Sequence, residues 1–250
     1  MSKATRDRTA REKLAEERRL QAQRDKQKRM LGAVGAAAAV IVVVVGVFVF
    51  VNSNRDKAED FVGALAPTSR ASDGSIVMAK AGVTSPVLEV FEDFQCPACK
   101  NLEKTSGNTF KQLAADGKAK VVYRPFRLFQ QTPLKENSER AANAALCAPG
   151  DNWVPFHDKI YAEQPPEGKV GFSNSDLISW AAGLSTPITG DAFTQCVNGA
   201  EKSAQVQAMT DYALKVGKVE STPTVKLDGK DITNDAFVPS DLKKAVADAG

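Results

Sequence analysis

Histidine and closely spaced cysteines are scarce in this chain of 250 residues. His157 is the only histidine, and the four cysteines include one close pair, Cys96 and Cys99, whereas Cys147 and Cys196 lie 49 positions apart. A structural zinc site needs four sulfur or nitrogen ligands, which commonly come in two close pairs. The sequence therefore disfavours zinc, and we expect the protein to hold no metal.

Charge is absent from residues 31–51, which read LGAVGAAAAVIVVVVGVFVFV. These 21 residues would form a helix about 31 Å long at about 1.5 Å per residue, which is enough to span a bilayer. The run is too long, too apolar and too rich in β-branched residues for a buried core helix. It is followed by Asn-Ser-Asn-Arg-Asp-Lys rather than a cleavage site, so we expect an uncleaved transmembrane signal-anchor instead of a removed signal peptide.

The residues before this run indicate its orientation. Residues 1–30 contain eleven Lys or Arg and five Asp or Glu, a net +6, which leaves −3 for the rest of a chain whose total is +3. By the positive-inside tendency, this basic arm stays in the cytoplasm and the larger C-terminal part is exported. We therefore expect a single-pass protein of the cell membrane with an extracytoplasmic domain, where disulfides persist. The arm has no aromatic side chain for stacking bases, so we expect no nucleic-acid partner.

The exported part reads as a stalk followed by one α/β domain. Residues 52–74 mix charged residues with Ala, Ser, Gly and Pro without periodicity, which is typical of a linker. Residues 75–250 alternate between strand-like and helix-like segments. The predicted strands are 75–79, 86–94, 119–126, 222–227 and 230–233, and the predicted helices run from the CPAC tetrapeptide to 117 and over 134–148, 153–163, 175–183, 191–216 and 240–248. This order predicts a parallel strand pair around the first helix, a helical insertion at about 130–217 and a hairpin turn at Asp228-Gly229.

The stretch DFQCPACK, residues 93–100, carries the expected chemistry. Cys96 and Cys99, three positions apart at a helix start, lie on one face and are close enough for a disulfide. Pro97 suits the first helical turn, and Cys96 at the helix edge meets unpaired backbone N–H groups that stabilise a thiolate. Cys96 is thus the expected nucleophile and Cys99 the resolving thiol. A purely structural bridge would close too short a loop to stabilise much, so a redox-active disulfide, with no other cofactor, is favoured.

Further segments accompany this motif in a fixed order. After VLEVFEDFQCPACK come VVYRPFRLF, AANAALCAPGDNWVPFHDKIYAEQP, DAFTQCV and ESTPTVKLDGK. Together they resemble the DsbA-like thiol-disulfide oxidoreductases of the thioredoxin superfamily over most of residues 75–250. The resemblance implies a thioredoxin fold with an inserted helical subdomain, in which Pro97, Ala98, Thr222 and Pro223 surround the redox disulfide. It also implies a cis Thr222–Pro223 bond; from the residues alone, a proline that leads a strand is the alternative.

The resemblance also implies partners and a direction of reaction. Substrates would be exported proteins with cysteines, which pair with the backbone at Thr222 as an added strand does. The reoxidant would be a membrane quinone-linked protein of the DsbB type or the vitamin K epoxide reductase-like type. Oxidation of substrate cysteine pairs is the favoured function. A reductase or isomerase, for example in cytochrome c maturation, is the alternative, and a membrane-tethered binding module or chaperone is a third.

Two positions depart from the DsbA-like pattern. Ala98 stands where some strongly oxidising members have a histidine, so the oxidising strength stays open. A buried carboxylate that accepts protons beneath the cysteine pair is another theme of the family, but position 90 is Val. Glu89, Glu92 and Asp93 are nearby candidates, and a surface location is an equal alternative for each.

The remaining cysteines and the histidine are assigned to structure. If Cys96 pairs with Cys99, then Cys147 and Cys196 are left to each other among the three possible pairings. Neither has a cysteine close by in sequence, so a structural disulfide is favoured over a second redox site. The resemblance supports this, because second disulfides are common in the DsbA-like proteins of actinobacteria, and this chain resembles those proteins in composition. His157 lies among aromatic and apolar residues, which predicts a packed, hydrogen-bonded core residue outside the site.

Overall fold

The computed structural model describes residues 61–250. The predicted cytoplasmic arm (1–30), the predicted transmembrane helix (31–51) and the first part of the predicted stalk lie outside these residues. Within residues 61–250, every helix is too short or too polar to traverse a bilayer.

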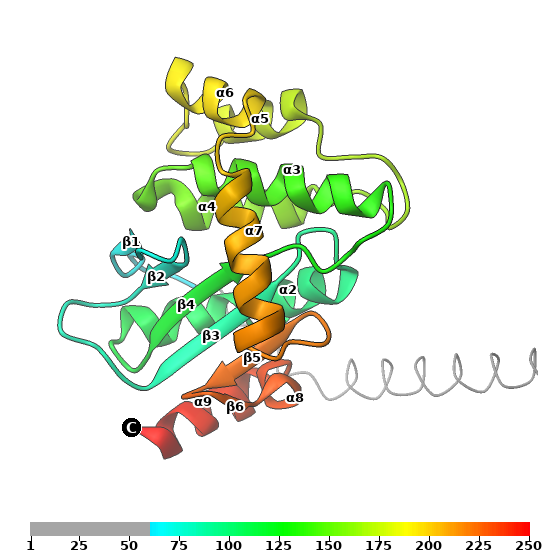
Figure 1. The fold of residues 1–250 in the computed structure, drawn as a ribbon. Coiled ribbons are helices and arrows are strands. Elements are labelled where there is room, and N and C mark those ends of the chain that lie inside the picture. The colour runs from blue at the N-terminus through cyan, green and yellow to red at the C-terminus, as the bar shows by residue number, and fades with distance from the viewer. Residues whose placement is uncertain (1–60) are drawn as a thin grey trace, which may run out of the picture. The chain divides into compact units, whose positions relative to one another are not determined.

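The framework is one mixed sheet whose strands lie in the order β1-β2-β4-β3-β5-β6 (Figure 1). The two central strands are parallel and are joined by helix α2 (Pro97–Ala115), as the strand-helix-strand pattern predicts. All other pairs are antiparallel. The strands are β1 (Thr68–Arg70), β2 (Ile76–Met78), β3 (Val87–Glu92), β4 (Lys120–Pro125), β5 (Thr224–Leu227) and β6 (Lys230–Asp231).

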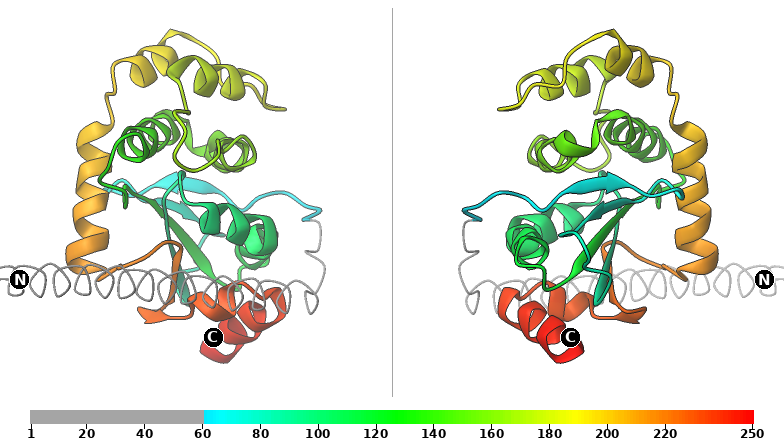
Figure 2. Two further views of the ribbon diagram at one scale, coloured as in Figure 1. Left: turned by 90° about the vertical axis from the view of Figure 1, so that its right-hand side faces the viewer. Right: turned by 90° about the vertical axis from the view of Figure 1, so that its left-hand side faces the viewer.

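Helices cover both faces of the sheet. Figure 2 shows α2 on one side of the sheet and α7 (Ser203–Asp211) on the other. The C-terminal helix α9 (Pro239–Ala249) packs against α2. Strands enclosed on both faces are rich in apolar residues, and Leu88, Val90 and Phe91 of β3 are completely buried. The thioredoxin-like α/β layer is thus built around β3, the strand that leads directly into the CPAC tetrapeptide.

The helical block is inserted between β4 and β5. It contains α3 (Leu134–Cys147), α4 (Gly150–Ala162), α5 (Asn174–Ala182), α6 (Asp191–Asn198) and α7, which continues as a π-helical turn, η1 (Tyr212–Val216). Figure 1 shows α3 to α6 stacked beyond one end of the sheet, with α7 returning alongside it. The block therefore lies at the same end of β3 as the start of α2.

Three sequence predictions need correction. The predicted stalk at 52–74 ends too late, because β1 belongs to the sheet and pairs with β2. The predicted helix 191–216 is interrupted after α6, where Gly199 caps the helix and Ala200 adopts a φ of 50°. The predicted strand 230–233 stops at Asp231, and a short helix α8 (Thr233–Ala236) follows. Very short strands and single-turn helices carry too few residues to show a hydrophobic period.

The turn at Asp228-Gly229 is confirmed. Both residues have positive φ values, 46° and 84°, as a tight hairpin turn of the type I′ family requires.

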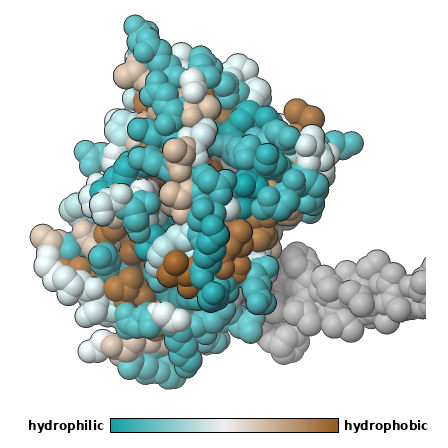
Figure 3. Space-filling view, in the orientation of Figure 1, coloured by the Kyte–Doolittle hydropathy of each residue, from teal (hydrophilic) through white to brown (hydrophobic). Residues whose placement is uncertain are grey.

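The surface of the domain is mostly polar. In the face shown in Figure 3, hydrophilic residues predominate and apolar residues form smaller patches between them. The large apolar side chains that are exposed in the described part are Val62, Val170, Leu214 and Val216.

Candidate redox site

The two cysteines of the CPAC tetrapeptide lie where β3 passes into α2. Cys96 is the N-cap of α2, with an extended backbone, and Pro97 begins the helix, as predicted. Both cysteines are free thiols in this structure. Cys96 is 6% exposed and Cys99 is completely buried, whereas Pro97 and Ala98 between them are exposed. A partner can therefore approach Cys96 over Pro97-Ala98 but cannot reach Cys99 directly.

The segment before β5 lies beside Cys96. The Thr222–Pro223 peptide bond is cis, as are Ser85–Pro86 and Thr132–Pro133. The Sγ of Cys96 donates a hydrogen bond to the carbonyl oxygen of Thr222, with the two atoms 3.3 Å apart. The structure thus brings together all six residues that the sequence assigns to the redox site: Cys96, Pro97, Ala98, Cys99, Thr222 and Pro223.

The surroundings give the two sulfurs opposite acid strengths. A hydrogen bond from Cys99 is the main reason that the pKa of Cys96 falls from 9.0 to about 7, and Thr222 and the backbone N–H groups of Cys99 and Ala98 add to it against the effect of burial. Burial, followed by the charges of Cys96 and Glu92, raises the pKa of Cys99 well above its ordinary value. A thiolate therefore forms first at Cys96, the sulfur nearer the surface.

Two polar side chains hold the turn that carries Cys96. Asp93 is completely buried and accepts hydrogen bonds from the backbone N–H groups of Gln95 and Leu128 and from the hydroxyl of Ser138. Gln164, after α4, donates to the carbonyl oxygens of Phe94 and Cys96, at 2.7 and 2.9 Å. The inserted helical block is thereby bonded to the redox turn.

The three candidate carboxylates on β3 and its end have different environments. Glu89 forms an ion pair with Arg124 at 2.8 Å and is partly exposed. Asp93 holds the turn, and Glu92 is 1% exposed with one carboxylate oxygen 3.0 Å from Nε2 of His157. The surface alternative is therefore wrong for Glu92 and Asp93. Their partners lie far away in sequence, so the pattern around Cys96 contains no signal for their burial.

His157 is a packed core residue, as predicted, but its contacts place it next to the redox site. Its ring stacks on Trp153 at 4.7 Å between ring centres, and it lies among Phe94, Tyr123 and Tyr161. Burial alone would lower the pKa of His157, but hydrogen bonds with Asp158 and Glu92 raise it to about 10. His157, which the sequence analysis placed outside the site, is therefore a buried cation that is hydrogen-bonded to Glu92.

One group of side chains has the composition of a metal site. Among the described residues, Glu92, Glu103 and His157 each place one potential ligand atom within 4.8 Å of the others. Nε2 of His157 is already bonded to Glu92, so a metal ion at this cluster would have to displace that bond.

The second cysteine pair connects two helices of the inserted block. Cys147, the last residue of α3, and Cys196, in α6, form a disulfide with a Cα–Cα distance of 5.9 Å. Cys147 lies at a helix end and Cys196 lies on a buried helix face, so neither sulfur is at a helix N-terminus as Cys96 is.

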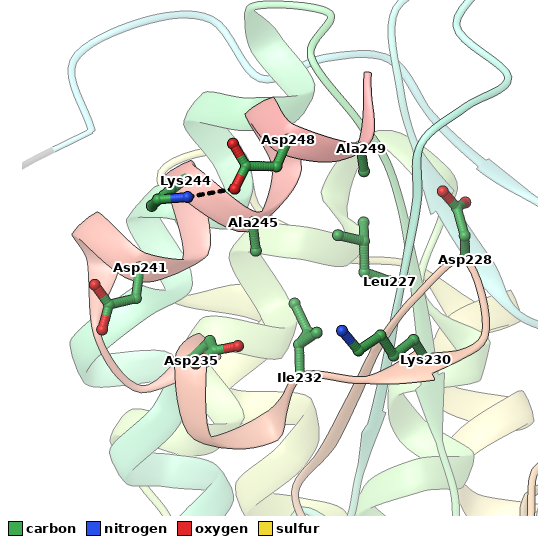
Figure 4. A pocket seen from close by; sticks show the side chains of 10 residues that line it. All are labelled: Leu227, Asp228, Lys230, Ile232, Asp235, Asp241, Lys244, Ala245, Asp248 and Ala249. Carbon is green, nitrogen blue, oxygen red and sulfur yellow. Dashed lines mark hydrogen bonds and ion pairs between the residues drawn. The ribbon is translucent and has the colours of Figure 1, made fainter.

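A pocket at the β5-β6 edge of the sheet contains none of the residues assigned to the redox site. Its volume is about 560 Å³, and it lies between the β5-β6 hairpin and helices α8 and α9 (Figure 4). Its charged side chains include Lys244, ion-paired with Asp248, and Asp235 and Asp241. No cysteine lines it, and its walls come from the C-terminal elements alone.

The fold and the site define a class of protein, a thioredoxin-fold oxidoreductase with a helical insertion. The sequence matches the family model described as Thioredoxin over residues 81–248, and the chain belongs to this family. It is 24% identical over 197 residues to the probable disulfide bond formation protein D of Bacillus anthracis, covering 78% of this chain and 84% of that protein.

Solved structures show the same fold. The MdbA protein of Corynebacterium diphtheriae, a thiol-disulfide oxidoreductase, is 22% identical with a TM-score of 0.60, over 78% of this chain and 99% of that chain. Reduced DsbA of Mycobacterium tuberculosis is 25% identical with a TM-score of 0.56, over 74% of this chain and 92% of that chain. The similarity extends beyond the α/β layer into the helical insertion, and the chain is an oxidoreductase.

Proposed function

We propose that this protein oxidises pairs of cysteines in exported proteins through a Cys96–Cys99 disulfide. The observation that carries the proposal is the position of Cys96: it caps α2, lies against the Thr222 carbonyl and has the buried Cys99 directly behind it. The relative named a disulfide bond formation protein supports the same direction. The uncharged run at 31–51 and the basic arm before it support a location at the outer face of the cell membrane.

The exchange has two steps. A substrate thiolate attacks Sγ of Cys96, the Cys96–Cys99 bond breaks, and its electron pair goes to the sulfur of Cys99. A second substrate thiolate then attacks the substrate sulfur of the mixed disulfide, and Cys96 leaves as a thiolate. The substrate pair is oxidised and the enzyme pair is reduced by the same two electrons. A Cys96 pKa near 7 makes this sulfur a good leaving group at neutral pH.

Substrate binding uses the segment before β5. An extended substrate peptide would pair with the backbone at Thr222 as an added strand does, which brings its cysteine to Cys96. Because Pro97 and Ala98 are exposed and uncharged, the contacts are mainly to main chain and apolar groups. Such recognition accepts many substrate sequences.

The reduced pair must be reoxidised by a partner. We propose a membrane quinone-linked protein, of the DsbB type or the vitamin K epoxide reductase-like type. A transmembrane anchor at 31–51 would keep the enzyme beside this partner and raise its effective concentration.

A reductase or isomerase is the second candidate, and a specific observation favours it. The pKa of Cys96, about 7, equals that of thioredoxin, about 7, and is far above the value of about 3.5 for a strong oxidase. Ala98 has no ionisable group that would lower it further.

Equilibration of the full chain in glutathione buffers separates the two candidates. We expect the Cys96–Cys99 pair to be more oxidising than thioredoxin, whose potential is about −270 mV. A potential at or below that of thioredoxin would exclude the oxidase and leave the reductase. In both cases, the variant Cys96→Ser should be inactive.

A further inference from the structure

A loop of the helical insertion is bonded to the redox turn. Residues 164–172 lie between α4 and α5 and contain no helix or strand. Gln164 begins the loop, and its side-chain Nε2 donates to the carbonyl oxygens of Phe94 and Cys96 at 2.7 and 2.9 Å. The first residue of the loop is thus hydrogen-bonded to the main chain of Cys96 itself.

The far end of the loop is attached to the same turn through a buried amide. Asn137, in the first turn of α3, is completely buried. Its Nδ2 donates to the carbonyl oxygen of Lys169, at 2.7 Å, and also to the side-chain oxygen of Gln95. The residue before Val170 and the residue before Cys96 therefore share one hydrogen-bond donor, which places the end of the loop beside the redox turn.

Further contacts close the loop on itself. The backbone N–H of Gly171 donates to Oδ1 of Asn137 at 3.1 Å, and the carbonyl oxygen of Gly171 accepts from Arg140 at 2.8 Å. A Cβ atom at position 171 would lie 2.4 Å from Cγ of Pro165, so the two ends of the loop meet where there is no room for a side chain. Compact surface loops whose ends lie close together are frequently functional.

This anchored loop exposes an apolar side chain. Val170 is 79% exposed, although the residues on either side of it are hydrogen-bonded. A single exposed valine is ordinary on a protein surface, but here the loop holds it in a fixed place near Cys96. Leu128 and Phe129, which follow β4, are partly exposed and lie at the same turn, because the N–H of Leu128 donates to Asp93 at 2.9 Å. Apolar side chains are therefore present on the insertion side of the redox turn.

The other segment that contacts Cys96 is polar. Sγ of Cys96 bonds to the carbonyl oxygen of Thr222, and the two residues before Thr222 are the exposed Glu220 and Ser221. An extended chain spans about 3.3 Å per residue, so a peptide whose cysteine is at Cys96 reaches beyond the redox turn within a few residues. The side chains that it meets differ between the Thr222 segment and the loop 164–172.

We propose that the loop 164–172 is a substrate subsite, in which Val170 selects peptides that have an apolar residue a few positions from the reacting cysteine. This inference rests on the proposed function and extends it, since main-chain pairing at Thr222 does not distinguish between side chains. When an apolar substrate residue covers Val170, both side chains leave water, which stabilises the encounter and the transition state of exchange alike. The sulfur chemistry at Cys96 is unchanged by this contact.

The test measures exchange between the full chain and synthetic peptides that contain a pair of cysteines. A leucine or a serine is placed in turn at each of about four positions on either side of the cysteine pair. In the wild type, leucine should raise the second-order rate constant about fivefold over serine at one or two positions, as expected for partial burial of a valine. In Val170→Ser this ratio should fall below about twofold, while the rates of the serine peptides stay unchanged.

The ratio is measured in both directions, with the oxidised chain and reduced peptides and with the reduced chain and oxidised peptides. A preference for leucine is then visible whether the protein is an oxidase or a reductase. Val62→Ser is the matched control, because Val62 is 89% exposed and lies before β1, and it should leave the ratio at the wild-type value.

Gly171→Ala is a second variant, which keeps Val170 but displaces the loop. The new Cβ atom overlaps the ring of Pro165, so the two ends of the loop must separate and Val170 must move. We expect the preference for leucine to fall as it does in Val170→Ser, with unchanged rates for the serine peptides.

The outcomes separate the inference from the function on which it rests. A wild type that exchanges equally with leucine and serine peptides, or a preference that survives in Val170→Ser, overturns the inference and leaves the proposed function intact. An equal loss of preference in Val62→Ser overturns it as well, because the effect would then not belong to the loop. Peptides that exchange in neither direction at Cys96 would refute the proposed function itself.

Discussion

The two cysteine pairs of this protein contain the same side chains in opposite surroundings. Cys96 and Cys99 are three positions apart at the start of α2, where one sulfur is acidic and close to the surface and the other is buried. Cys147 and Cys196 join α3 to α6 across 49 positions, and they lie at the end of α3 and in the second half of α6, away from a helix N-terminus. The setting of each sulfur, and not the presence of a disulfide, separates the pair that we propose to exchange electrons from the pair that joins two helices.

The largest expected effect is the loss of activity when the first pair is changed. Cys96→Ser should lower the rate of disulfide exchange with a reduced dithiol substrate by at least about a thousandfold, because a hydroxyl cannot form the mixed disulfide. The Cys147→Ala/Cys196→Ala double variant, assayed well below its unfolding temperature, should retain most of the wild-type rate. Equal losses in both proteins would remove the distinction between the pairs.

Changing only the resolving thiol should trap the intermediate. Cys99→Ala leaves the Cys96 thiolate able to attack a disulfide of a substrate protein, with one substrate sulfur as the leaving group, but removes the thiol that would release the mixed disulfide, so substrate proteins should accumulate as adducts. Non-reducing electrophoresis and mass spectrometry of the membrane fraction would identify them, with Cys96→Ala/Cys99→Ala as the control that yields none. Adducts formed through Cys147 or Cys196 would show that the second pair carries out the exchange, which contradicts our assignment.

The second pair should affect stability more than activity. A disulfide that closes a loop of this length stabilises by about 4 kcal/mol at most in the chain-entropy view. We expect Cys147→Ala/Cys196→Ala to lower the free energy of unfolding by about 2 to 4 kcal/mol, measured by denaturant titration of the full chain. A change below about 0.5 kcal/mol, the size of an ordinary surface substitution, would contradict a structural role.

Acidity should distinguish the two members of the first pair. Since the thiolate is the reactive form and the pKa of Cys96 is about 7, the rate of its alkylation by iodoacetamide in the reduced protein should rise with pH with a midpoint near pH 7. Cys99, whose pKa is raised by burial, should stay unmodified over the same range. A midpoint for Cys96 close to 9.0, its unperturbed value, would show that the helix start and Cys99 do not stabilise its thiolate.

The smallest effect concerns the residue between the cysteines. Ala98→His places an ionisable group at the helix start, where it should lower the pKa of Cys96 and make the pair more oxidising. A pKa change of one unit corresponds to about 1.4 kcal/mol, which equals about 30 mV for this two-electron couple. We expect a shift of about 20 mV in glutathione buffers, with Ala98→Gln as an uncharged control. No difference between the two variants would show that charge at this position has no influence.

The parts of the fold that the sequence predicts are those whose information is local. The run that precedes CPAC predicts β3, the dipeptide Asp228-Gly229 predicts the hairpin turn, and Pro97 marks the start of α2, all as observed. The break after α6 was missed because the apolar pattern continues on both sides of it. Gly199, which ends the helix, was the available signal.

The parts of the site that the sequence does not predict depend on contacts between distant segments. For Glu92 and Asp93 the sequence leaves a buried and a surface location equally open, because burial of a carboxylate is decided by its partners. Those partners are His157 and Ser138, 65 and 45 positions away. The position of the two cysteines at a helix start was predictable from the sequence, and the partners of the nearby carboxylates were not.

One measurement tests the distinction between the pairs most directly. The full chain is equilibrated over a series of glutathione and dithiothreitol buffers, the free thiols are alkylated, and mass spectrometry reports the oxidised fraction of each pair separately. We predict that Cys96–Cys99 is half reduced at a potential above about −270 mV, while Cys147–Cys196 stays oxidised below about −300 mV, as structural disulfides do. Coincident midpoints, or reduction of Cys147–Cys196 before Cys96–Cys99, would contradict the account.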